Sequence, residues 1–542
     1  MTHTPYTRLL SALYKDGISE IRTQKSGNSL PSLRVLTTEF FSNENIVDSE
    51  HSVALSAWGQ LSAHDLHLSM FQNGPSCCTD DSKPLNKEFN NCLAIVIPAN
   101  DLFYSASHTE CLNIKRLVNT ENINCSIKPA IPINNNTAAL DASFVYGSTA
   151  ETNKLIREFK DGRLRVENIN GRDFPPNMKN SGNRCAKNSK ICMLTGDVRG
   201  NQQPLIQSLQ VLFLRLHNWM VGNLKKINTH WDDEKLYQKG RLIISAIVQH
   251  ITYRHYLPII LGKQYMDSFG LATVSEGYNN VYDSSLDIQI STEFVACAYR
   301  SLHSMILDEY ELLDYTHSVV GTWTLSDTYD DTSIILQGDH FDQVIMGMTH
   351  QPMGKMDLNF PMSTSNLLLQ KNGVGSDLAA TDIGRGRDTG LKSYPHFINM
   401  VGLGYPESWE DLEETMDRDI VKRLRLFYDT VDDVDPFLGG MLENQVEGTM
   451  FGPTFLAIIS EQYYLLQRGD RHYYELGDQP HSFTLEQLRE IRKVTLATVF
   501  CLCGDNIQLM QQDVFRTISE DNPLTRCTEI IGDFSLKPWA RK

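Results

Sequence analysis

An imidazole, an amide and a carboxylate lie close together in the segment WGQLSAHD, which spans positions 58–65. Apolar and small residues fill the rest of this segment. We therefore expect a buried helix over 52–67, on which Gln60 and His64 share one face because they are four residues apart. An imidazole in such a place can accept a proton and return it, so His64 is a candidate acid–base residue. The alternative is a core histidine satisfied by a hydrogen bond, and partners elsewhere in the chain must decide between the two.

A second segment, TAALDAS at 137–143, sets side-chain oxygens at alternating positions after a run of asparagines. Calcium binds about six to eight oxygen ligands in proteins. This loop can offer Thr137 through its hydroxyl and carbonyl, Ala139 through its carbonyl, Asp141, and Ser143 through its hydroxyl. The same residue types also form ordinary turns, and a calcium site would need a carboxylate from another segment.

Three further segments carry charged or metal-binding side chains. Arg199 precedes a helix that we expect to begin near Pro204, so its guanidinium can reach a buried cavity from the helix entrance, or lie on the surface. His303 lies in an apolar helix with small residues, which permit close approach of a flat ligand but also serve helix packing. Arg385 and Arg387 lie among glycines and aspartates, and two arginines at one site suit a pair of ligand carboxylates.

Bulk composition excludes several classes of function. The chain has 542 residues, of which 41% are hydrophobic, and its net charge is -17. The acidic balance and the lack of a long Lys/Arg run argue against binding to nucleic acid or to an anionic membrane surface, and favour basic partners or small neutral substrates. No run of about 18 apolar residues is present, so we expect no membrane span. The first six residues also lack the pattern of a signal peptide.

Helical periodicity dominates the chain. We expect long helices from Pro204 to Met220 and from Asp232 to Tyr256, where Pro258 follows. Strand signals are few, and Ser333–Leu336 is the best of them. Together these patterns predict one mainly α-helical domain over 1–542 with very little sheet. The remaining helices are expected at 52–67, 289–306, 409–424 and 482–502.

Eleven cysteines are present, and none forms two CxxC pairs at zinc-ribbon spacing. Their position near Pro, Asn and Gly in loops favours disulfides over metal ligands, and thus an oxidising compartment. Asn124 and Asn135 begin glycosylation sequons. We therefore expect a secreted, extracellular glycoprotein whose leader is absent from this chain.

Taken together, these segments resemble the animal haem peroxidase family of the peroxidase–cyclooxygenase superfamily, closest to its arthropod branch. The resemblance runs from about Pro5 to Trp539 and implies a large, single-domain α-helical haem peroxidase fold. Its signposts follow the family's order: WGQLSAHD at 58–65, LDASFVYGS at 140–148, DVR at 197–199, LRLHN at 214–218, WDDE at 231–234, ITYR at 251–254, His303, GRGRD at 384–388 with GL at 390–391, GPTF at 452–455 and GDR at 469–471.

The resemblance assigns a role to each candidate residue. His64 corresponds to the distal histidine, Gln60 to its neighbour in the distal cavity, Arg199 to the distal arginine and His303 to the proximal ligand of the haem iron. Asp65 corresponds to the carboxylate that joins Thr137, Ala139, Asp141 and Ser143 around calcium and thereby anchors the distal helix. Arg385 corresponds to the arginine that pairs a haem propionate, and Arg300 is a second candidate for that role.

These roles imply the reaction of a haem peroxidase that reduces hydrogen peroxide. His64 takes a proton from peroxide bound opposite His303 and returns it to the distal oxygen, while Arg199 stabilises the charge on the leaving hydroxide. The resemblance implies a ferryl state after water leaves, and two one-electron steps with phenolic or tyrosyl donors then restore ferric iron. Such an enzyme would cross-link extracellular matrix or dispose of peroxide in a response to oxidative stress.

This chain departs from the family at four positions near the haem. Ala63 and Gln202 stand where many members carry the Asp and Glu that esterify the haem, and Gln203 is not the Met of a sulfonium link. We therefore expect non-covalent haem b. Asp382 stands where the family usually has Asn beside the proximal histidine. A carboxylate that accepts from His303 Nδ1–H gives the ligand more imidazolate character and favours O–O cleavage.

The resemblance also implies how the cysteines pair and which other functions compete. Cys77 and Cys78 would pair with Cys92 and Cys111, Cys185 with Cys192, and Cys501 with Cys527, leaving Cys125, Cys297 and Cys503; Cys297 is expected to be a buried free thiol. One competing function is a catalytically weak or non-catalytic adhesive or matrix protein. Another is fatty-acid oxygenation, which needs a radical Tyr three residues before the proximal histidine. Arg300 stands there, and Tyr299 lies four residues before His303.

Overall fold

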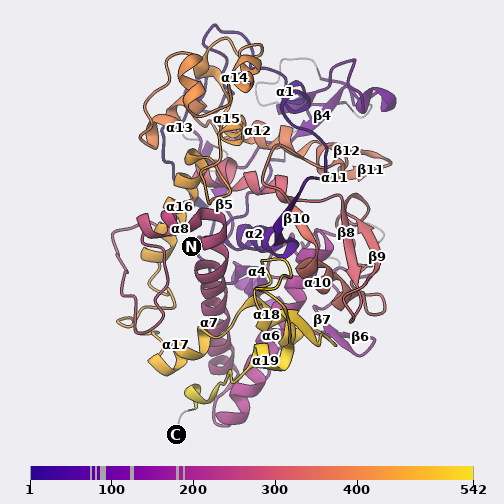
Figure 1. Cartoon of the computed structure of the whole chain (residues 1–542), viewed down its shortest axis with the longest axis vertical. Helices are drawn as coiled ribbons and strands as arrows, with labels where there is room; N and C mark the ends of the chain where they lie inside the picture. The colour runs from indigo at the N-terminus through magenta and orange to yellow at the C-terminus, as the bar shows by residue number, and fades with distance from the viewer. Residues whose placement is uncertain are drawn as a thin grey trace.

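Helices are the main elements of the computed structural model, as the sequence predicts (Figure 1). The structure describes residues 2–73, 76–79, 82–85, 93–121, 127–178, 182–186 and 189–540. The α-helices are α1 (Leu33–Phe40), α2 (Val53–Leu66), α4 (Ser143–Tyr146), α5 (Ala150–Ile156), α6 (Pro204–Ile227), α7 (Asp233–Ile251), α8 (Leu257–Ser268), α9 (Thr292–Ala296), α10 (His340–His350), α11 (Met362–Ser365), α12 (Leu378–Asp388), α13 (Tyr394–Met400), α14 (Arg418–Leu424), α15 (Pro436–Leu442), α16 (Pro453–Arg468), α17 (Leu485–Ile491), α18 (Leu496–Cys503) and α19 (Cys527–Ile531).

Shorter helices of other types join them. One is a π-helical segment, η2 (Thr252–Tyr256). The others are 3₁₀ helices: η1 (Tyr104–Ser107), η3 (Ala298–Met305), η4 (Leu325–Asp327), η5 (Glu410–Glu414), η6 (Val431–Asp433) and η7 (Lys537–Trp539).

Strands form only two-stranded antiparallel sheets within the described part of the chain. This agrees with the prediction of very little sheet. The pairs are β1 (Thr4–Pro5) with β5 (Ile133–Asn134), β2 (Val47–Ser52) with β10 (Pro352–Gly354), β3 (Leu93–Val96) with β4 (Cys111–Ile114), β6 (Glu167–Ile169) with β7 (Arg172–Phe174), β8 (Glu309–Leu313) with β9 (Val319–Thr324), β11 (Leu368–Lys371) with β12 (Val374–Ser376), and β13 (Leu509–Gln511) with β14 (Leu524–Arg526).

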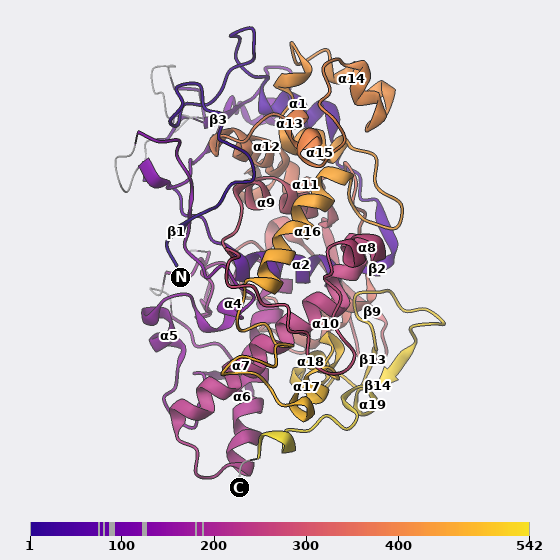
Figure 2. The same ribbon diagram turned by 90° about the vertical axis from the view of Figure 1, so that its left-hand side faces the viewer.

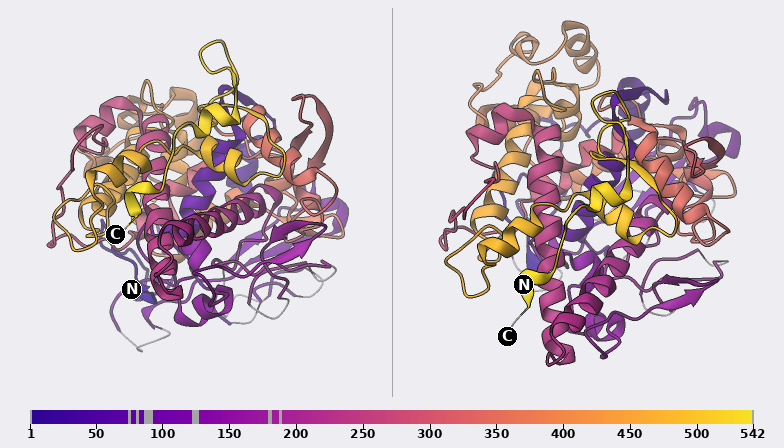
Figure 3. Two further views of the ribbon diagram at one scale, coloured as in Figure 1. Left: turned by 90° about the horizontal axis from the view of Figure 1, so that it is seen from below. Right: turned by 60° about the horizontal axis from the view of Figure 1, so that its bottom comes forward.

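The two longest helices, α6 and α7, pack against each other, and Figure 3 shows from below how the C-terminal segment joins them at this end of the molecule. Gln203 caps α6 by accepting a hydrogen bond from the Leu205 backbone N–H, and Pro204 fits the first turn because it needs no N–H partner there. Asp232 caps α7 by accepting from the Lys235 backbone N–H. The chain then passes without a break through η2 into α8, where Pro258 lies in the first turn rather than ending the helix.

Helix α2 lies in the middle of the molecule, where α4, α6, α10 and η3 pack against it and α16 passes nearby (Figure 2). Ser52 caps the helix by accepting from the Ala54 backbone N–H. Most of its side chains are buried, and Trp58 Nε1 donates to Thr252 Oγ1 over 3.2 Å. Gly59 allows the closest approach: a Cβ there would lie 2.8 Å from the Tyr256 hydroxyl oxygen and 3.1 Å from a methyl carbon of Leu302. Small residues on α2 thus bring η3 close to the helix that carries His64.

Four of the predicted elements differ from the observed ones. The predicted helix 289–306 is divided into α9 and η3, because Cys297 has non-helical dihedral angles of φ -140° and ψ -85°. The helices predicted at 409–424 and 482–502 are each two shorter helices. The strand predicted at Ser333–Leu336 is wrong, because these residues form turns. The turns begin beside Asp331, whose carboxylate accepts from the Ser333 backbone N–H.

The cysteine pairing agrees with the prediction wherever both partners are described. The disulfides are Cys78–Cys111, Cys185–Cys192 and Cys501–Cys527. Cys77 is also disulfide-bonded, whereas Cys92 and Cys125 lie outside the described residues. Cys297 and Cys503 are buried free thiols. No helix among the described residues is long and apolar enough to cross a membrane.

Candidate active site

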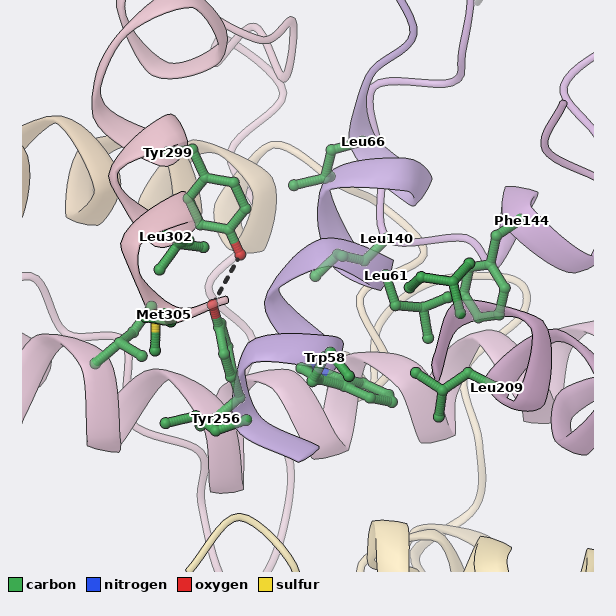
Figure 4. Packing of buried hydrophobic residues seen from close by; sticks show 14 of the residues in the cluster. Trp58, Leu61, Leu66, Leu140, Phe144, Leu209, Tyr256, Tyr299, Leu302 and Met305 are labelled. Atoms are coloured by element: carbon green, nitrogen blue, oxygen red, sulfur yellow. Dashed lines mark hydrogen bonds between the residues drawn. The ribbon is translucent and has the colours of Figure 1, made fainter. Parts of the chain in front are cut away.

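A cavity of about 260 Å³ lies between α2, η3 and the segment that leads into α6. Five predicted site residues line it together: Gln60, His64, Arg199, Arg300 and His303. Figure 4 shows Tyr299 and Leu302 of η3, which both line the cavity, next to α2. The rest of the lining is mainly apolar and includes Ala57, Ala63, Leu205, Val295, Ile306, Leu325, Leu368 and Leu378.

His64 is almost fully buried, with only 4% of its surface exposed. Its Nδ1 has no hydrogen-bond partner and lies 3.9 Å from Asp197 Oδ1. Burial lowers the pKa of the imidazole to about 3, and the positive charge of Arg199 adds to this effect. His64 is therefore a neutral base at physiological pH. Its own backbone carbonyl is held by the Asn136 side-chain amide, which donates over 2.5 Å.

Arg199 is held by the carboxylate of Asp197, two residues before it. Its Nε donates to Asp197 Oδ1 over 2.8 Å and its Nη2 to Oδ2 over 2.6 Å. Nη2 also donates to the backbone carbonyls of His67 (2.8 Å) and His64 (3.3 Å) at the end of α2. Burial opposes ionisation of Asp197, but the guanidinium outweighs it and lowers the pKa of this carboxyl to about 2. The pair thus places a fixed positive group beside His64.

Gln60 joins the two residues that precede α6. Its amide donates to Gln202 Oε1 over 3.3 Å, and Gln203 Nε2 donates to Gln60 Oε1 over 2.8 Å. All three side chains line the cavity. An amide network therefore occupies this part of the cavity wall, and Ala63 also lines the cavity.

His303 lies on η3, with its Nδ1 2.7 Å from Asp382 Oδ2. The other carboxylate oxygen of Asp382 accepts from Arg300 Nη1 over 2.8 Å, and Asp382 itself is fully buried on α12. The His303 ring remains 30% exposed, towards the cavity that it lines. With Nδ1 engaged, Nε2 is the ring nitrogen left to bind a ligand. Asp382 sets the direction of both cavity side chains.

Arg385 lies apart from the cavity lining. Its Nη1 donates to Asp388 Oδ2 over 2.6 Å and to the Lys115 carbonyl over 3.1 Å. Arg184 lines the cavity instead, and its Nη2 donates to Asp330 over 3.0 Å. Of the two arginines predicted for the propionates, the structure therefore brings Arg300, and not Arg385, into the cavity.

The candidate calcium ligands gather at the C-terminal end of α2. The Asp65 carboxylate accepts from the backbone N–H groups of Ala142 (3.1 Å) and Ser143 (2.5 Å) and from the Ser143 hydroxyl (2.7 Å). Thr137 Oγ1 donates to Asp141 Oδ1 over 2.9 Å. Burial raises the pKa of Asp65 well above its usual value, and the charge of Asp141 raises it further. No hydrogen bond joins Ala139 to this group within the described residues.

A cation would relieve the repulsion between Asp65 and Asp141. Hydroxyl, carbonyl and carboxylate oxygens are the donors that calcium prefers. The residues present therefore fit calcium. In the described part of the chain no group of three or more His, Cys, Asp or Glu side chains could hold a metal ion; the set at Asp65 has two carboxylates, and its other donors are hydroxyl and carbonyl oxygens.

The residues present also fit a haem group. The unpartnered Nδ1 of His64 points to a missing polar partner, since buried polar atoms are nearly always hydrogen-bonded. His303 offers one ring nitrogen to the same cavity, and the apolar lining suits a flat, largely apolar ligand.

Sequence reasoning missed three side chains at this site: Asp197, His67 and Arg184. Asp197 was visible in the sequence only as part of the DVR motif, where its spacing from Arg199 allows an ion pair. His67 lies three residues after His64 and lines the same cavity. Burial lowers the pKa of His67 well below its usual value. Arg184 carries no pattern in the sequence that marks it.

Comparison with known proteins identifies the family. The animal haem peroxidase family profile matches residues 1–515. A peroxidase from Drosophila melanogaster is 37% identical over 553 aligned residues, covering 99% of this chain and 80% of that protein. A chorion peroxidase from Aedes aegypti is 34% identical over 539 residues, covering 97% and 67%. The chain belongs to the animal haem peroxidase family.

Solved structures agree with this assignment. Peroxidase A from Dictyostelium discoideum aligns with a TM-score of 0.78 and 25% identity, over 95% of this chain and 96% of that chain. A fatty acid alpha-dioxygenase from Oryza sativa aligns with a TM-score of 0.70 over 92% and 81%; at 20% identity it shows the common fold alone. The predictions of the family, of a mainly α-helical fold and of a haem peroxidase enzyme are thus confirmed.

Proposed function

We propose that this enzyme reduces hydrogen peroxide with a non-covalent haem b held by His303, and oxidises phenolic or tyrosyl donors one electron at a time. One observation carries the proposal. A neutral, unpartnered His64 next to the Arg199–Asp197 pair shares its cavity with His303, whose Nδ1 is engaged by Asp382. Base, fixed cation and iron ligand are the three groups that peroxide cleavage needs.

His64 and Arg199 divide the work on peroxide. His64 accepts the proton of the oxygen that reacts and returns it to the oxygen that leaves, since its neutral imidazole can do both. Arg199 stabilises the negative charge on the leaving oxygen, and its ion pair with Asp197 holds it in place before the reaction begins. The Gln60 amide, fixed by Gln202 and Gln203, orients peroxide or water in the cavity.

His303 would bind the haem iron through Nε2, and Arg300 and Arg184 are the cavity arginines that could pair the propionates. Haem would supply the iron that peroxide oxidises. Asp382 accepts from His303 Nδ1–H and gives the imidazole more anionic character, which lowers the potential of a bound metal. Arg385 would not pair a propionate directly, because its guanidinium already forms an ion pair with Asp388.

The haem should leave the polypeptide completely when the protein is extracted with acidified organic solvent. Ala63 and the amide of Gln202 cannot form esters, and both line the cavity. The measurement is haem absorbance in the organic phase against that left with the protein. Ala63→Asp is the matched variant, because it restores one carboxylate on the same wall. Haem that stays on the unaltered chain after extraction would contradict the proposal.

Calcium is proposed to bind between Asp65, Thr137, Ala139, Asp141 and Ser143, and to fix the end of α2 next to His64. The mutual repulsion of the two carboxylates supports this. The ion would act as a brace for the distal helix rather than as a catalyst.

An extracellular setting fits the disulfides, and the named chorion peroxidase relatives support it. Matrix cross-linking or peroxide disposal is the proposed biological use. Of the two sequons, Asn124 lies outside the described residues. The Asn135 amide donates to the Leu68 carbonyl over 3.3 Å, so this side chain is a poor acceptor for a glycan.

The proposed function is tested by loading the purified chain with haem and following guaiacol or tyrosine oxidation on addition of peroxide. We expect a Soret band and donor oxidation that depends on peroxide. A Soret band without donor oxidation would instead identify the adhesive, non-catalytic alternative. Oxygen uptake with a fatty acid would identify the oxygenase alternative, which Arg300 disfavours.

A further inference from the structure

A row of buried tyrosines leads away from the haem cavity. Tyr299 lines the cavity, and its hydroxyl lies 2.8 Å from the hydroxyl of Tyr463 on α16. The Tyr463 ring lies next to that of Tyr253 in η2, with ring centroids 6.0 Å apart, and Tyr253 donates to the Tyr463 carbonyl over 2.7 Å. A π-helical segment such as η2 often marks a functional position, and here it presents Tyr253 to the row.

The row continues to a second pocket at the surface. Tyr473 lies next to Tyr253 with ring centroids 5.4 Å apart, and Tyr474 lies next to Tyr473 at 5.2 Å. Both side chains line a small pocket whose rim includes the exposed residues Arg471, His472 and His481. Five tyrosines therefore lead from the cavity to this pocket, just beneath the surface, through contacts of 5.2–6.2 Å between ring centroids; Tyr473 and Tyr474 are each 2% exposed.

Proton acceptors are placed mainly at the outer end of the row. Oxidation of a buried phenol releases its proton, so an electron vacancy is most stable beside a base. The Tyr474 hydroxyl lies 2.9 Å from His250 Nδ1 and 3.2 Å from Glu475 Oε1. Burial lowers the pKa of His250 to about 3, so this imidazole is neutral and can accept a proton. Tyr299, Tyr463 and Tyr253 contact only hydroxyl or carbonyl oxygens.

We propose that Tyr299, Tyr463, Tyr253, Tyr473 and Tyr474 conduct electrons from the surface pocket to the haem cavity, so that one-electron donors on macromolecules can be oxidised without entering the cavity. The proposal rests on the proposed peroxidase function, which supplies the oxidant. Figure 4 shows the inner end of the row, where the hydroxyls of Tyr299 and Tyr256 meet.

Each step in this scheme balances. Tyr474 gives one electron inward along the row and its phenolic proton to His250. A donor AH at the pocket then gives one electron to the Tyr474 radical and its proton to water, while His250 returns its proton to Tyr474. This restores both groups and releases the radical A•, and one proton from water enters the haem cavity with each electron. Two such steps for each peroxide give H₂O₂ + 2 AH → 2 H₂O + 2 A•.

Two matched variants, Tyr463→Phe and Tyr256→Phe, test the row. Both remove a buried hydroxyl that contacts the Tyr299 hydroxyl, at 2.8 and 3.2 Å. Only Tyr463 leads on to Tyr253. Phenylalanine keeps the ring but is far harder to oxidise, so Tyr463→Phe interrupts the row whereas Tyr256→Phe leaves it intact.

The probes are ferrocytochrome c, which is too large for the cavity, and guaiacol, which is small. With haem-loaded enzyme and peroxide, Tyr463→Phe should slow ferrocytochrome c oxidation about tenfold or more, equal to about 1.4 kcal/mol in activation free energy, while guaiacol oxidation stays within about twofold. Tyr256→Phe should match the unaltered enzyme with both donors. Equal ferrocytochrome c rates in all three proteins, or a parallel loss with both donors in Tyr463→Phe, would overturn the proposal.

A spectroscopic readout makes the test independent of turnover. After one equivalent of peroxide without donor, rapid-freeze electron paramagnetic resonance should detect a tyrosyl radical that is lost when Tyr473 and Tyr474 are both replaced by Phe. A radical unchanged in that double variant would overturn the proposal. If the unaltered enzyme fails to oxidise even guaiacol, the proposed peroxidase function is wrong. If it oxidises guaiacol but the variants behave as described above for an overturned proposal, only electron transfer along the tyrosine row is wrong.

Discussion

Replacing His64 by Ala should slow the reaction of the haem-loaded enzyme with peroxide by about 10²–10⁴-fold, the range that a positioned acid–base group contributes. His64 is buried and neutral, its Nδ1 has no protein partner, and the Arg199–Asp197 pair lies beside it. Alanine removes the proton acceptor but leaves His303 and Asp382 in place, so haem binding should persist. Stopped-flow absorption of the Soret band against peroxide concentration measures the rate directly.

His67→Ala is the matched control for this prediction. His67 is a second neutral histidine that lines the same cavity, three residues further along the chain. Its removal enlarges the cavity but leaves His64 beside Asp197. We therefore expect the rate of the reaction with peroxide to fall by less than about tenfold, well below the range for a lost acid–base group. Equal losses in the two variants would assign the effect to cavity shape. A loss confined to His67→Ala would make His67 the base.

Replacing Asp65 by Ala should destabilise the protein strongly. The change leaves the buried backbone N–H groups of Ala142 and Ser143 without their acceptor, at about 1–3 kcal/mol for each group. It also removes the carboxylate proposed to bind calcium. A thermal unfolding scan should therefore show a clearly lower Tm than that of the unaltered protein. An unchanged Tm would contradict the bracing role of Asp65.

Asp65→Asn removes the charge with a smaller loss of hydrogen bonds than Asp65→Ala. Asparagine keeps one oxygen acceptor for one of the two backbone N–H groups, whereas its NH₂ group cannot accept from the other, and it lacks the charge that attracts calcium. A calcium chelator should lower the Tm of the unaltered protein and leave that of Asp65→Asn nearly unchanged, because ligand binding stabilises only a fold that binds it. A chelator without effect on the unaltered protein would rule out a stabilising calcium ion.

Periodicity predicts the long helices well because their apolar faces are continuous. Helix α2 lies within one residue of its expected ends, and α6 begins at Pro204 as expected. The break inside 289–306 was not predictable, because the backbone at Cys297 turns where α9 and η3 pack against other elements. Ser333–Leu336 has the composition of a strand, but it has no partner strand and forms turns around Asp331.

The sequence predicted some contacts of the site and not others. Resemblance to the family named Asp382 as the partner of His303, and the two lie 2.7 Å apart. It named Arg385 for a propionate, but Asp388 lies three residues away on the same helix and binds this arginine. Arg184 and His67 reach the cavity only through the tertiary fold. The tyrosine row is likewise invisible in the sequence, since its members come from η3, α16, η2 and the segment after α16.

The most direct measurement is rapid mixing of the haem-loaded, unaltered chain with one equivalent of peroxide, followed by Soret absorption. If His64, Arg199 and His303 act together at one haem, the band should shift with a rate proportional to peroxide concentration and return when guaiacol is added. A band that forms on haem loading but does not respond to peroxide would contradict the account.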